Sequence, residues 1–303
     1  MPDVSVIIVN WNARDYLLKC LASLRSGLGR LDAEVIVVDN ASSDGSARAV
    51  REGFPEVKLL EQDENLGFAR ANNIGMRESS AGYVCLVNSD VIVLDGSLEE
   101  LHRFLEARPE AALAGPRVLN PDESLQPTCR RFPSLRGSLL SAIGLDGWNY
   151  FSHDRTARVE ALSGCLLMIR RKAIDDVGML DERFFFYAED KDWCKRFHDA
   201  GYENWYCTEA EAVHYGGSSS GLAPVRFYVE MQKANLKYWE KHRGRAARAA
   251  YVAITLLHQL VRFARSGALY ILKPAERRSA AHKAKRSAAC LKWLLTGGDA
   301  AQP

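Results

Sequence analysis

The stretch Tyr83-Val-Cys-Leu-Val-Asn-Ser-Asp90 joins an apolar run to a group of polar side chains, and the rest of the chain is arranged around it. Residues 84–87 are apolar with a β-branched residue at each end, which is typical of a short buried strand. Asn88, Ser89 and Asp90 then follow at its carboxyl end. Ligands of open α/β sheets bind at that edge. Taken alone, the stretch fits a binding site or an ordinary strand-ending turn.

Oxygen donors at positions 88 and 90 suit a hard divalent cation. Side chains two residues apart in an extended chain point to the same face, so the Asn88 amide and the Asp90 carboxylate can reach one point. Mg²⁺ and Mn²⁺ prefer such oxygens and also bind phosphate oxygens. We therefore predict that Asp90 is a metal ligand with Asn88 beside it.

The first 115 residues alternate between strand-like and helix-like segments. Apolar β-branched runs predict the strands, and apolar residues at helical spacing predict the helices. The predicted strands are 4–9, 34–38, 57–60 and 84–87, and the predicted helices are 15–24, 44–51, 70–76 and 97–107. This order predicts a parallel sheet with right-handed crossovers. The first strand is not followed by Gly-x-Gly-x-x-Gly, which disfavours a dinucleotide site.

Composition narrows the class of protein. The net charge of +2 over 303 residues gives no general nucleic-acid signature, so we expect no nucleic-acid partner. Seven cysteines without a Cys-x-x-Cys pair predict buried free thiols in a reducing compartment. The amino terminus lacks a signal-like core, and no uncharged stretch reaches the roughly 18 to 20 residues of a membrane span. We therefore expect a cytoplasmic protein, located in one reading at the inner face of the cell membrane.

The second half is less regular. We predict strands at 161–169, 202–207 and 212–215, helices at 172–177, 191–200 and 225–242, and a flexible loop at 216–221. Residues 117–160 give no clear pattern. These segments complete a predicted domain of residues 1–242, with halves at 1–115 and 116–242.

Residues 243–303 are predicted to form a helical, basic C-terminal extension. Between Lys241 and Arg286 there are twelve Lys or Arg residues and one acid, Glu276. Within it, 249–272 is apolar but interrupted by Arg262 and Arg265. Such a segment suits an interfacial helix on an anionic membrane, and it equally suits a helix packed on the preceding domain with solvated arginines.

Several motifs in order resemble family 2 glycosyltransferases, particularly the rhamnosyltransferase-like branch, over residues 3–240. The motifs are Val4-Ser-Val-Ile-Ile-Val-Asn-Trp-Asn12, Val35-Ile-Val-Val-Asp-Asn-Ala-Ser-Ser-Asp-Gly-Ser46, Asn65-Leu-Gly-Phe-Ala-Arg-Ala-Asn-Asn73, Leu86-Val-Asn-Ser-Asp90, Phe184-Phe-Phe-Tyr-Ala-Glu-Asp190 and His214. The resemblance implies a GT-A fold with a mostly parallel sheet flanked by helices. It also implies a nucleotide-sugar donor, a divalent metal (Mg²⁺ or Mn²⁺) and inversion at the anomeric carbon.

The resemblance also implies residue roles. Asp39 matches the position that contacts the base, Asp190 matches the catalytic base, and His214 matches a histidine near the metal or the diphosphate. The family pattern at the metal is Asp-x-Asp, whereas this chain has Asn88-Ser-Asp90, one negative charge fewer. The remaining nucleotide-sugar contacts that we expect are Asn12, Asn65, Arg70, Asn73 and Asn88.

The acids at 189–190 have a simpler explanation as well, because carboxylates favour helix starts. That explanation suffices for Glu189. The aromatic run 184–187 shifts the balance for Asp190, since apolar surroundings raise the pKa of a carboxylate and strengthen its basicity.

We thus predict an inverting glycosyltransferase that takes a sugar, rhamnose in one reading, from a nucleoside-diphosphate sugar. The predicted acceptor is a saccharide or lipid-linked saccharide, and the product would serve cell-surface polysaccharide assembly. We expect acceptor selection to lie in residues 117–160. Two alternatives stay open, a sugar nucleotidyltransferase and a noncatalytic nucleotide-sugar-binding module. The first would favour a glycine- and basic-rich loop where Asn10-Trp-Asn12 stands.

Overall fold

The computed structural model describes residues 1–145, 151–216 and 223–297. The chain divides into two compact units. The sheet unit comprises Met1–Phe132, Tyr150–Phe185 and Glu189–Ser219, and the helical unit comprises Pro133–Asn149, Phe186–Ala188 and Ser220–Pro303. The domain boundary expected between residues 242 and 243 stays a prediction.

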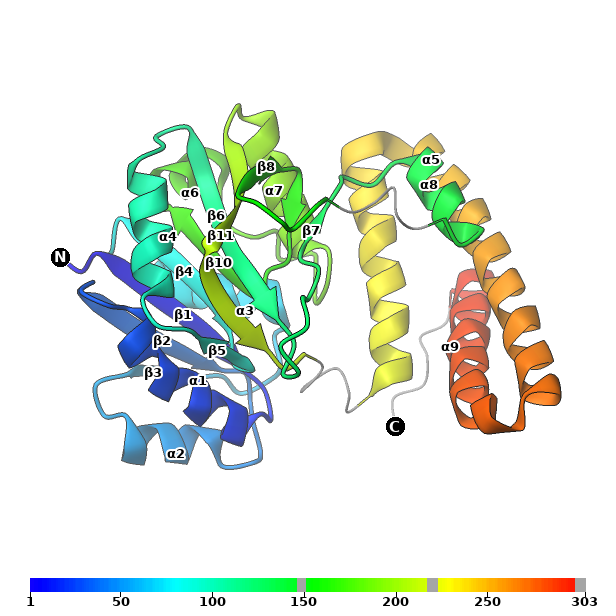
Figure 1. Cartoon of the computed structure of the whole chain (residues 1–303). Helices are drawn as coiled ribbons and strands as arrows, with labels where there is room; N and C mark the ends of the chain where they lie inside the picture. Colours follow the sequence, from blue (N-terminus) through cyan, green and yellow to red (C-terminus); the bar gives the residue numbers. More distant parts are fainter. Residues whose placement is uncertain (146–150, 217–222, 298–303) are drawn as a thin grey trace. The chain divides into compact units, whose positions relative to one another are not determined.

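Most strands of the sheet unit join one mixed sheet. The strands are β1 (Val4–Asn10), β2 (Ala33–Asp39), β3 (Lys58–Glu61), β4 (Tyr83–Asn88), β5 (Val91–Val93), β6 (Ala111–Leu119), β8 (Ala157–Val159), β10 (Leu166–Arg170) and β11 (Glu203–His214). Among the described residues their order is β3-β2-β1-β4-β10-β6-β11-β5, with β8 paired to β11 (Figure 1). The first four strands are parallel, as predicted, and β10 runs antiparallel to both of its neighbours. A separate antiparallel pair joins β7 (Cys129–Arg130) to β9 (Ala161–Leu162).

Helices cover both faces of the sheet, which explains why its central strands are apolar throughout. These helices are α1 (Arg14–Gly27), α2 (Ser46–Gly53), α3 (Phe68–Arg77), α4 (Ser97–Glu106), α6 (Arg171–Val177) and α7 (Glu189–Asp199). Alternate residues of a strand point to opposite faces. Val6 and Ile8 therefore pack in one cluster with residues of α1, α2 and α4, whereas Ile7 packs in another with residues of α3, α6 and α7.

Two predictions in the second half need correction, and a third stays untested. The strands expected at 202–207 and 212–215 are one strand, β11, which stays paired to β6 across a register shift between Cys207 and Glu211. The polar residues in that irregular stretch interrupt the apolar pattern and mimic a break. The segment 161–169 contains two strands, because residues 163–165 form a turn between them. The first, β9, pairs with β7, and the second, β10, joins the large sheet. The loop expected at 216–221 lies, apart from Gly216, outside the described residues.

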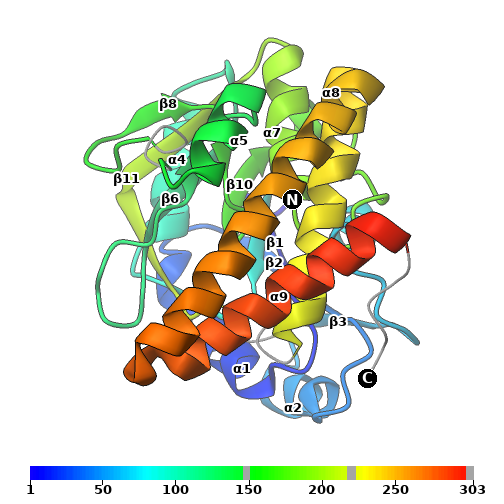
Figure 2. The same ribbon diagram turned by 90° about the vertical axis from the view of Figure 1, so that its right-hand side faces the viewer.

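The helical unit is built mainly from α8 (Pro224–Leu272) and α9 (Arg277–Thr296), joined by a 3₁₀ turn at Pro274–Glu276, and it also contains α5 (Leu135–Ala142). Gly244 has non-helical angles (φ 78°, ψ 177°) and divides α8 into two arms. The first arm corresponds to the helix predicted at 225–242, and α9 packs along α8 (Figures 1 and 2). None of the described helices is both long and apolar enough to cross a membrane.

Candidate active site

The carboxyl ends of β1, β2 and β4 bring the predicted site residues Asp39 and Asn88 to one edge of the sheet. Asn10 stands opposite Asp39, and Val9 stands opposite Asn88. Neighbouring strands lie about 4.8 Å apart, so the backbones at Asp39 and Asn88, on either side of β1, are about 10 Å apart. The sheet therefore gathers the predicted base-binding and metal-binding segments.

A hydrogen-bonded turn holds the carboxylate of Asp39. Its Oδ1 accepts from the amide of Asn10 at 3.0 Å, and its Oδ2 accepts from the backbone N–H of Ser42 at 2.9 Å. Asn12 stands in the left-handed region (φ 50°), where asparagine is one of the tolerated residues. The Asn12 side-chain oxygen accepts from the N–H of Ser43 at 2.8 Å. Both predicted nucleotide contacts thus belong to one preorganised turn.

Asp90 and His214 are 124 positions apart in the sequence and adjacent in the fold. Strand β11 pairs antiparallel with β5 and places His214 opposite Val91. The backbone N–H of Tyr215 also donates to the carbonyl of Asp90 at 3.0 Å. As a result His214 Nε2 lies 3.2 Å from Asp90 Oδ1, and both side chains are largely buried.

Gln126 holds the other side of the His214 ring. Its Oε1 lies 2.7 Å from His214 Nδ1, while its Nε2 donates to the carbonyl of His214 at 3.2 Å and to Asn120 Oδ1 at 2.8 Å. Two acceptors on Nε2 fix the amide orientation, so Oε1 receives a proton from Nδ1. Gln126 lies in the stretch that gave no clear pattern, and no sequence signal marks it.

The donor atoms here fit a divalent cation that also binds a phosphate. With the proton on Nδ1, a neutral His214 ring presents the lone pair of Nε2 to Asp90, whereas a charged ring presents a second N–H. A lone pair and a carboxylate oxygen facing each other are the arrangement that a cation satisfies. Asn88 adds a buried Oδ1 that has no hydrogen-bond partner among the described residues. No group of three or more His, Cys, Asp or Glu side chains in the described parts of the chain is arranged to hold a metal ion by itself, and Mg²⁺ sites commonly take their other ligands from substrate phosphates.

Asp190 lies beside the same edge through the segment 163–165. Its Oδ2 accepts from the N–H of Gly164 at 3.1 Å, and the carbonyl of Cys165 accepts from the N–H of Asn88 at 2.9 Å. Burial raises the pKa of the Cys165 thiol to about 11, and the carboxylates of Asp90 and Asp190 both add to the rise. The two hydrogen bonds thus connect Asp190 and the strand end at Asn88 through the segment 163–165.

Glu189 is a functional candidate that the sequence reading set aside. Its side chain is 6% exposed, and its Oε2 has no hydrogen-bond partner among the described residues. Burial raises the pKa of Glu189 to about 8, and the charge of Asp190 contributes. Tyr187 and Ala188 directly before it have φ values of 71° and 68°. Such backbone in non-glycine residues is uncommon and concentrates at functional sites.

The motif 65–73 braces the segment that leads to Asp190. The N–H of Phe68 donates to the carbonyl of Phe185 at 2.7 Å, and Gly67 (φ 80°) approaches that carbonyl so closely that a Cβ would lie 2.3 Å from it. Asn65 accepts from Asn40 Nδ2 at 2.9 Å and from the N–H of Gly67 at 3.0 Å.

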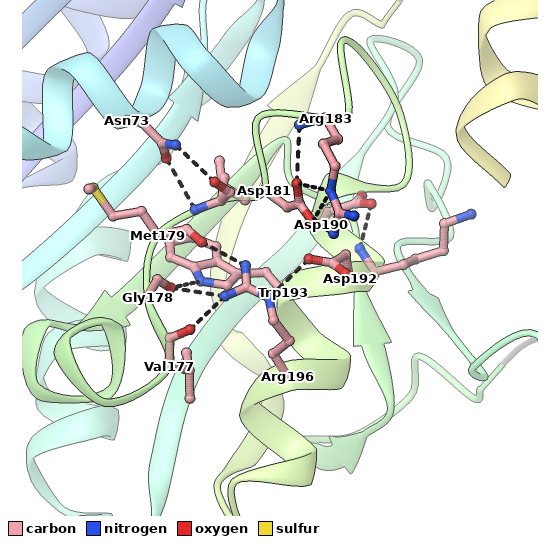
Figure 3. A network of polar contacts seen from close by, with 12 residues as sticks. Asn73, Val177, Gly178, Met179, Asp181, Arg183, Asp190, Asp192, Trp193 and Arg196 are labelled. Atoms are coloured by element: carbon pink, nitrogen blue, oxygen red, sulfur yellow. Dashed lines mark hydrogen bonds and ion pairs between the residues drawn. The ribbon is translucent and has the colours of Figure 1, made fainter. Parts of the chain in front are cut away.

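Asn73 and Arg70 occupy different environments on α3. The buried amide of Asn73 donates to the carbonyl of Leu180 and accepts from its N–H (Figure 3), and it also donates to Glu182. All of its polar atoms are thus engaged within the protein. Arg70 is exposed. Figure 3 also shows how Arg196 of α7 bonds Asp192 and the carbonyls of 177–179, which fixes the helix behind Asp190.

Comparisons with known proteins find similar glycosyltransferases. The chain is 32% identical, over 80% of its length and 87% of the relative's, to an N-acetylglucosaminyl-diphospho-decaprenol L-rhamnosyltransferase of Mycobacterium tuberculosis. It is 25% identical to the dTDP-rhamnosyl transferase RfbF of Shigella flexneri, over 84% of this chain and 86% of that one.

Solved structures share the fold. A mannosyltransferase of Pyrobaculum calidifontis, solved with GDP-Man and Mn²⁺, has a TM-score of 0.58 at 17% identity, covering 96% of this chain and 87% of its own. TarS of S. aureus has a TM-score of 0.53 at 13% identity, covering 97% and 92%. Both likenesses support the predicted GT-A-type fold. The model of glycosyl transferase family 2 matches residues 5–178, so the chain belongs to this family of glycosyltransferases.

Proposed function

We propose that this glycosyltransferase moves a sugar, with inversion, from a nucleoside-diphosphate sugar to an acceptor hydroxyl. The observation that carries the proposal is that Asp90 lies beside His214, while Asp190 is bonded to the segment 163–165, whose Cys165 carbonyl accepts from the N–H of Asn88. A cation-binding pair and a separate carboxylate are the two parts that such a transfer needs.

The donor is held along the carboxyl edge. The turn of Asp39 and Asn12 offers oriented oxygens for a base, of which those of Asp39 are buried, and the exposed Arg70 can pair with a phosphate. Two relatives are named as rhamnosyltransferases, and one of these names specifies dTDP-rhamnose. We therefore propose dTDP-rhamnose as the first donor to test.

Asp190 serves as the general base. The hydrogen bonds from Gly164 N–H and Lys191 N–H orient its carboxylate and leave lone pairs for an acceptor hydroxyl. Asp190 takes the hydroxyl proton while the oxygen attacks the anomeric carbon on the face opposite the diphosphate. Asp90 and His214, with Asn88 nearby, would hold Mg²⁺ or Mn²⁺. When bound, such a cation supplies positive charge to the leaving diphosphate.

The acceptor is proposed to be a saccharide on a lipid diphosphate. The relative from Mycobacterium tuberculosis carries that chemistry in its name, and the product class would serve cell-surface polysaccharide assembly. Residues 117–160 remain the proposed region of acceptor selection.

One assay separates this function from its alternatives. The purified chain is incubated with a panel of nucleotide sugars, Mn²⁺ and a lipid-linked saccharide, and the products are identified by mass spectrometry. Transfer predicts a nucleoside diphosphate together with a glycosylated acceptor. Pyrophosphate release would indicate a nucleotidyltransferase. Donor-induced stabilisation without any turnover across the panel would indicate a noncatalytic binding module.

We also propose that the helical unit contacts an anionic membrane. The second arm of α8 buries the polar residues Thr255, Gln259 and Ser266 against its neighbours. The same arm exposes large apolar side chains, namely Leu257 (49%), Leu260 (55%), Val261 (49%), Phe263 (45%), Ile271 (72%) and Leu272 (76%). A helix with polar residues inside and apolar residues outside suits an apolar environment.

Vesicle sedimentation tests this contact in the full-length chain. Leu260→Glu and Phe263→Glu place charges on the exposed apolar side chains and should release the protein from anionic vesicles. Leu125→Glu, at a 36% exposed apolar side chain of the sheet unit, is the control. Equal partitioning of all variants would exclude this surface as the membrane contact.

A further inference from the structure

A second polar cluster lies in the helical unit, between both arms of α8 and α9. The hydroxyl of Tyr228 on the first arm accepts from Gln259 Nε2 at 2.7 Å and from an Arg262 guanidinium nitrogen at 3.2 Å, both on the second arm. The guanidinium carbons of Arg262 and Arg286 lie 5.3 and 5.8 Å from the Tyr228 ring centre. Three helices thus bring two arginines to one tyrosine.

These arginines have no carboxylate partner among the described residues. The acids within residues 223–297 are Glu230, Glu240 and Glu276. Each pairs elsewhere, with Lys233, with Arg245 and Arg248, and with Lys273, respectively. Two half-buried positive charges that share one neutral tyrosine leave a local excess of positive charge, because each guanidinium retains its charge at any ordinary pH.

Buried polar atoms around the cluster are also unsatisfied. Arg286 Nε, Ser287 Oγ and Gln259 Oε1 have no hydrogen-bond partner within the described residues, and Gln259 and Ser287 are 1% and 0% exposed. A buried polar group without a partner costs about 1–3 kcal/mol; Gln259 and Arg286 both contact Tyr228, and Ser287 directly follows Arg286, so a polar ligand bound here would satisfy these atoms. Arg286 Nε and Ser287 Oγ can donate to an anion, whereas Gln259 Oε1 can only accept a hydrogen bond.

We propose that Tyr228, Gln259, Arg262, Arg286 and Ser287 form a binding site for a phosphate monoester. Guanidinium groups bind phosphate oxygens through paired N–H donors. A phosphate monoester near its second pKa of about 6 also retains an O–H in part of the population, and this group satisfies Gln259 Oε1. The site lies outside the proposed transfer site and does not depend on the transferase reaction.

The phosphate can come from a lipid headgroup or from a free phosphate compound. Leu257 and Leu260 are exposed on the same helical arm as Gln259 and Arg262, so an attached acyl chain would meet apolar side chains there. The test therefore compares vesicles of phosphatidylcholine with phosphatidic acid, a monoester, against vesicles of equal charge with phosphatidylglycerol, a diester. Inorganic phosphate and sulfate at equal ionic strength form the second arm, read by thermal shift.

The variants are Arg262→Gln and Arg286→Gln in the full-length chain, with Arg265→Gln as matched control. Arg265 is an exposed arginine on the same arm. Each site variant should weaken binding to phosphatidic acid vesicles about 10-fold or more, while the control should bind like the original chain. Circular dichroism checks that the variants fold. If they do not, the comparison of the two kinds of vesicle with the original chain still tests the proposal.

A monoester preference that both site variants lose supports the proposal, and phosphate but not sulfate stabilisation shows that the free anion suffices. Monoester preference without any effect of free phosphate assigns the site to lipid headgroups. Equal binding to both charged vesicles with no phosphate stabilisation would overturn the proposal, as would equal losses in all three variants.

Discussion

The Oε1 atom of Gln126 lies 2.7 Å from Nδ1 of His214, and this contact determines what the opposite ring nitrogen can do. Nδ1 carries a proton in this contact. The lone pair of Nε2, which lies 3.2 Å from Asp90, can therefore bind either a second proton or a cation. A cation that binds there must replace any proton on Nε2, so metal binding and proton release are coupled.

Gln126→Leu should therefore weaken the metal site without removing a ligand. The variant loses the acceptor that fixes the ring, and such supporting contacts are typically worth about 10- to 100-fold in metal affinity. The measurement is the Mn²⁺ concentration that gives half-maximal transfer. Gln126→Glu keeps an acceptor oxygen at Nδ1 and should stay closer to the original chain. An unchanged Mn²⁺ requirement in Gln126→Leu would remove Gln126 from this role.

Asp190→Asn should bind the donor normally and transfer sugar about 10²- to 10⁴-fold more slowly. An amide oxygen can still accept the N–H of Gly164, which preserves the geometry, but it cannot take a proton from the acceptor. Donor affinity is measured by calorimetry, and transfer is measured by product formation. Asp199→Asn, at the exposed other end of α7, is the control. Transfer at the original rate in Asp190→Asn would require a different base.

Gly67→Ala tests the brace between α3 and the segment before Asp190. The added Cβ would lie 2.3 Å from the carbonyl of Phe185, and the residue would also have to keep a φ of 80°. We expect a loss of about 1–3 kcal/mol in the free energy of unfolding and a lower kcat. Gly53→Ala is the control, because no atom lies within 4 Å of its added Cβ and its φ is not positive. Equal effects at both glycines would contradict the brace.

Strands β1, β2 and β4 could be predicted because each carries a buried apolar run next to polar turn residues, whereas the edge strand β3 has only Leu59 and Leu60 between two charged residues. That pattern is local, so β1 to β4 and the helices between them appear where the sequence places them. The position of Asp90 at the end of β4 follows from the same pattern. Its contact with His214 depends on the pairing of β5 with β11. The family resemblance indicated that histidine, whereas local pattern alone did not.

The rest depended on tertiary contacts without a local signal. The side chain of Gln126 contacts His214, which is 88 positions away in the sequence, and Gln126 lies in a stretch with little regular structure. Asn73 was predicted to contact the donor, and its buried amide instead engages Leu180 and Glu182 within the protein. Its spacing on α3 could not distinguish a ligand contact from a brace, because both require a polar side chain that faces inward.

Glu189→Gln should change how the stability of the protein depends on pH. Burial raises the pKa of Glu189 to about 8 from its ordinary value of 4.5. Between these values the folded chain holds a proton that the unfolded chain has released. The free energy of unfolding therefore falls as pH rises, by up to about 1.4 kcal/mol per pH unit. Below about pH 4.5 both states hold the proton, and the penalty disappears.

The glutamine is uncharged at every pH and nearly the same size, so Glu189→Gln removes this slope. Urea unfolding between pH 5 and pH 8 should show the variant gaining on the original chain as pH rises, with the difference levelling off above about pH 8. Glu56→Gln, at an exposed carboxylate, should instead follow the original chain in parallel. A Glu189→Gln difference that is constant across this range would mean that Glu189 is already ionised in the folded protein. In that case its neighbour Asp190 would carry out its proposed proton transfer beside a second negative charge.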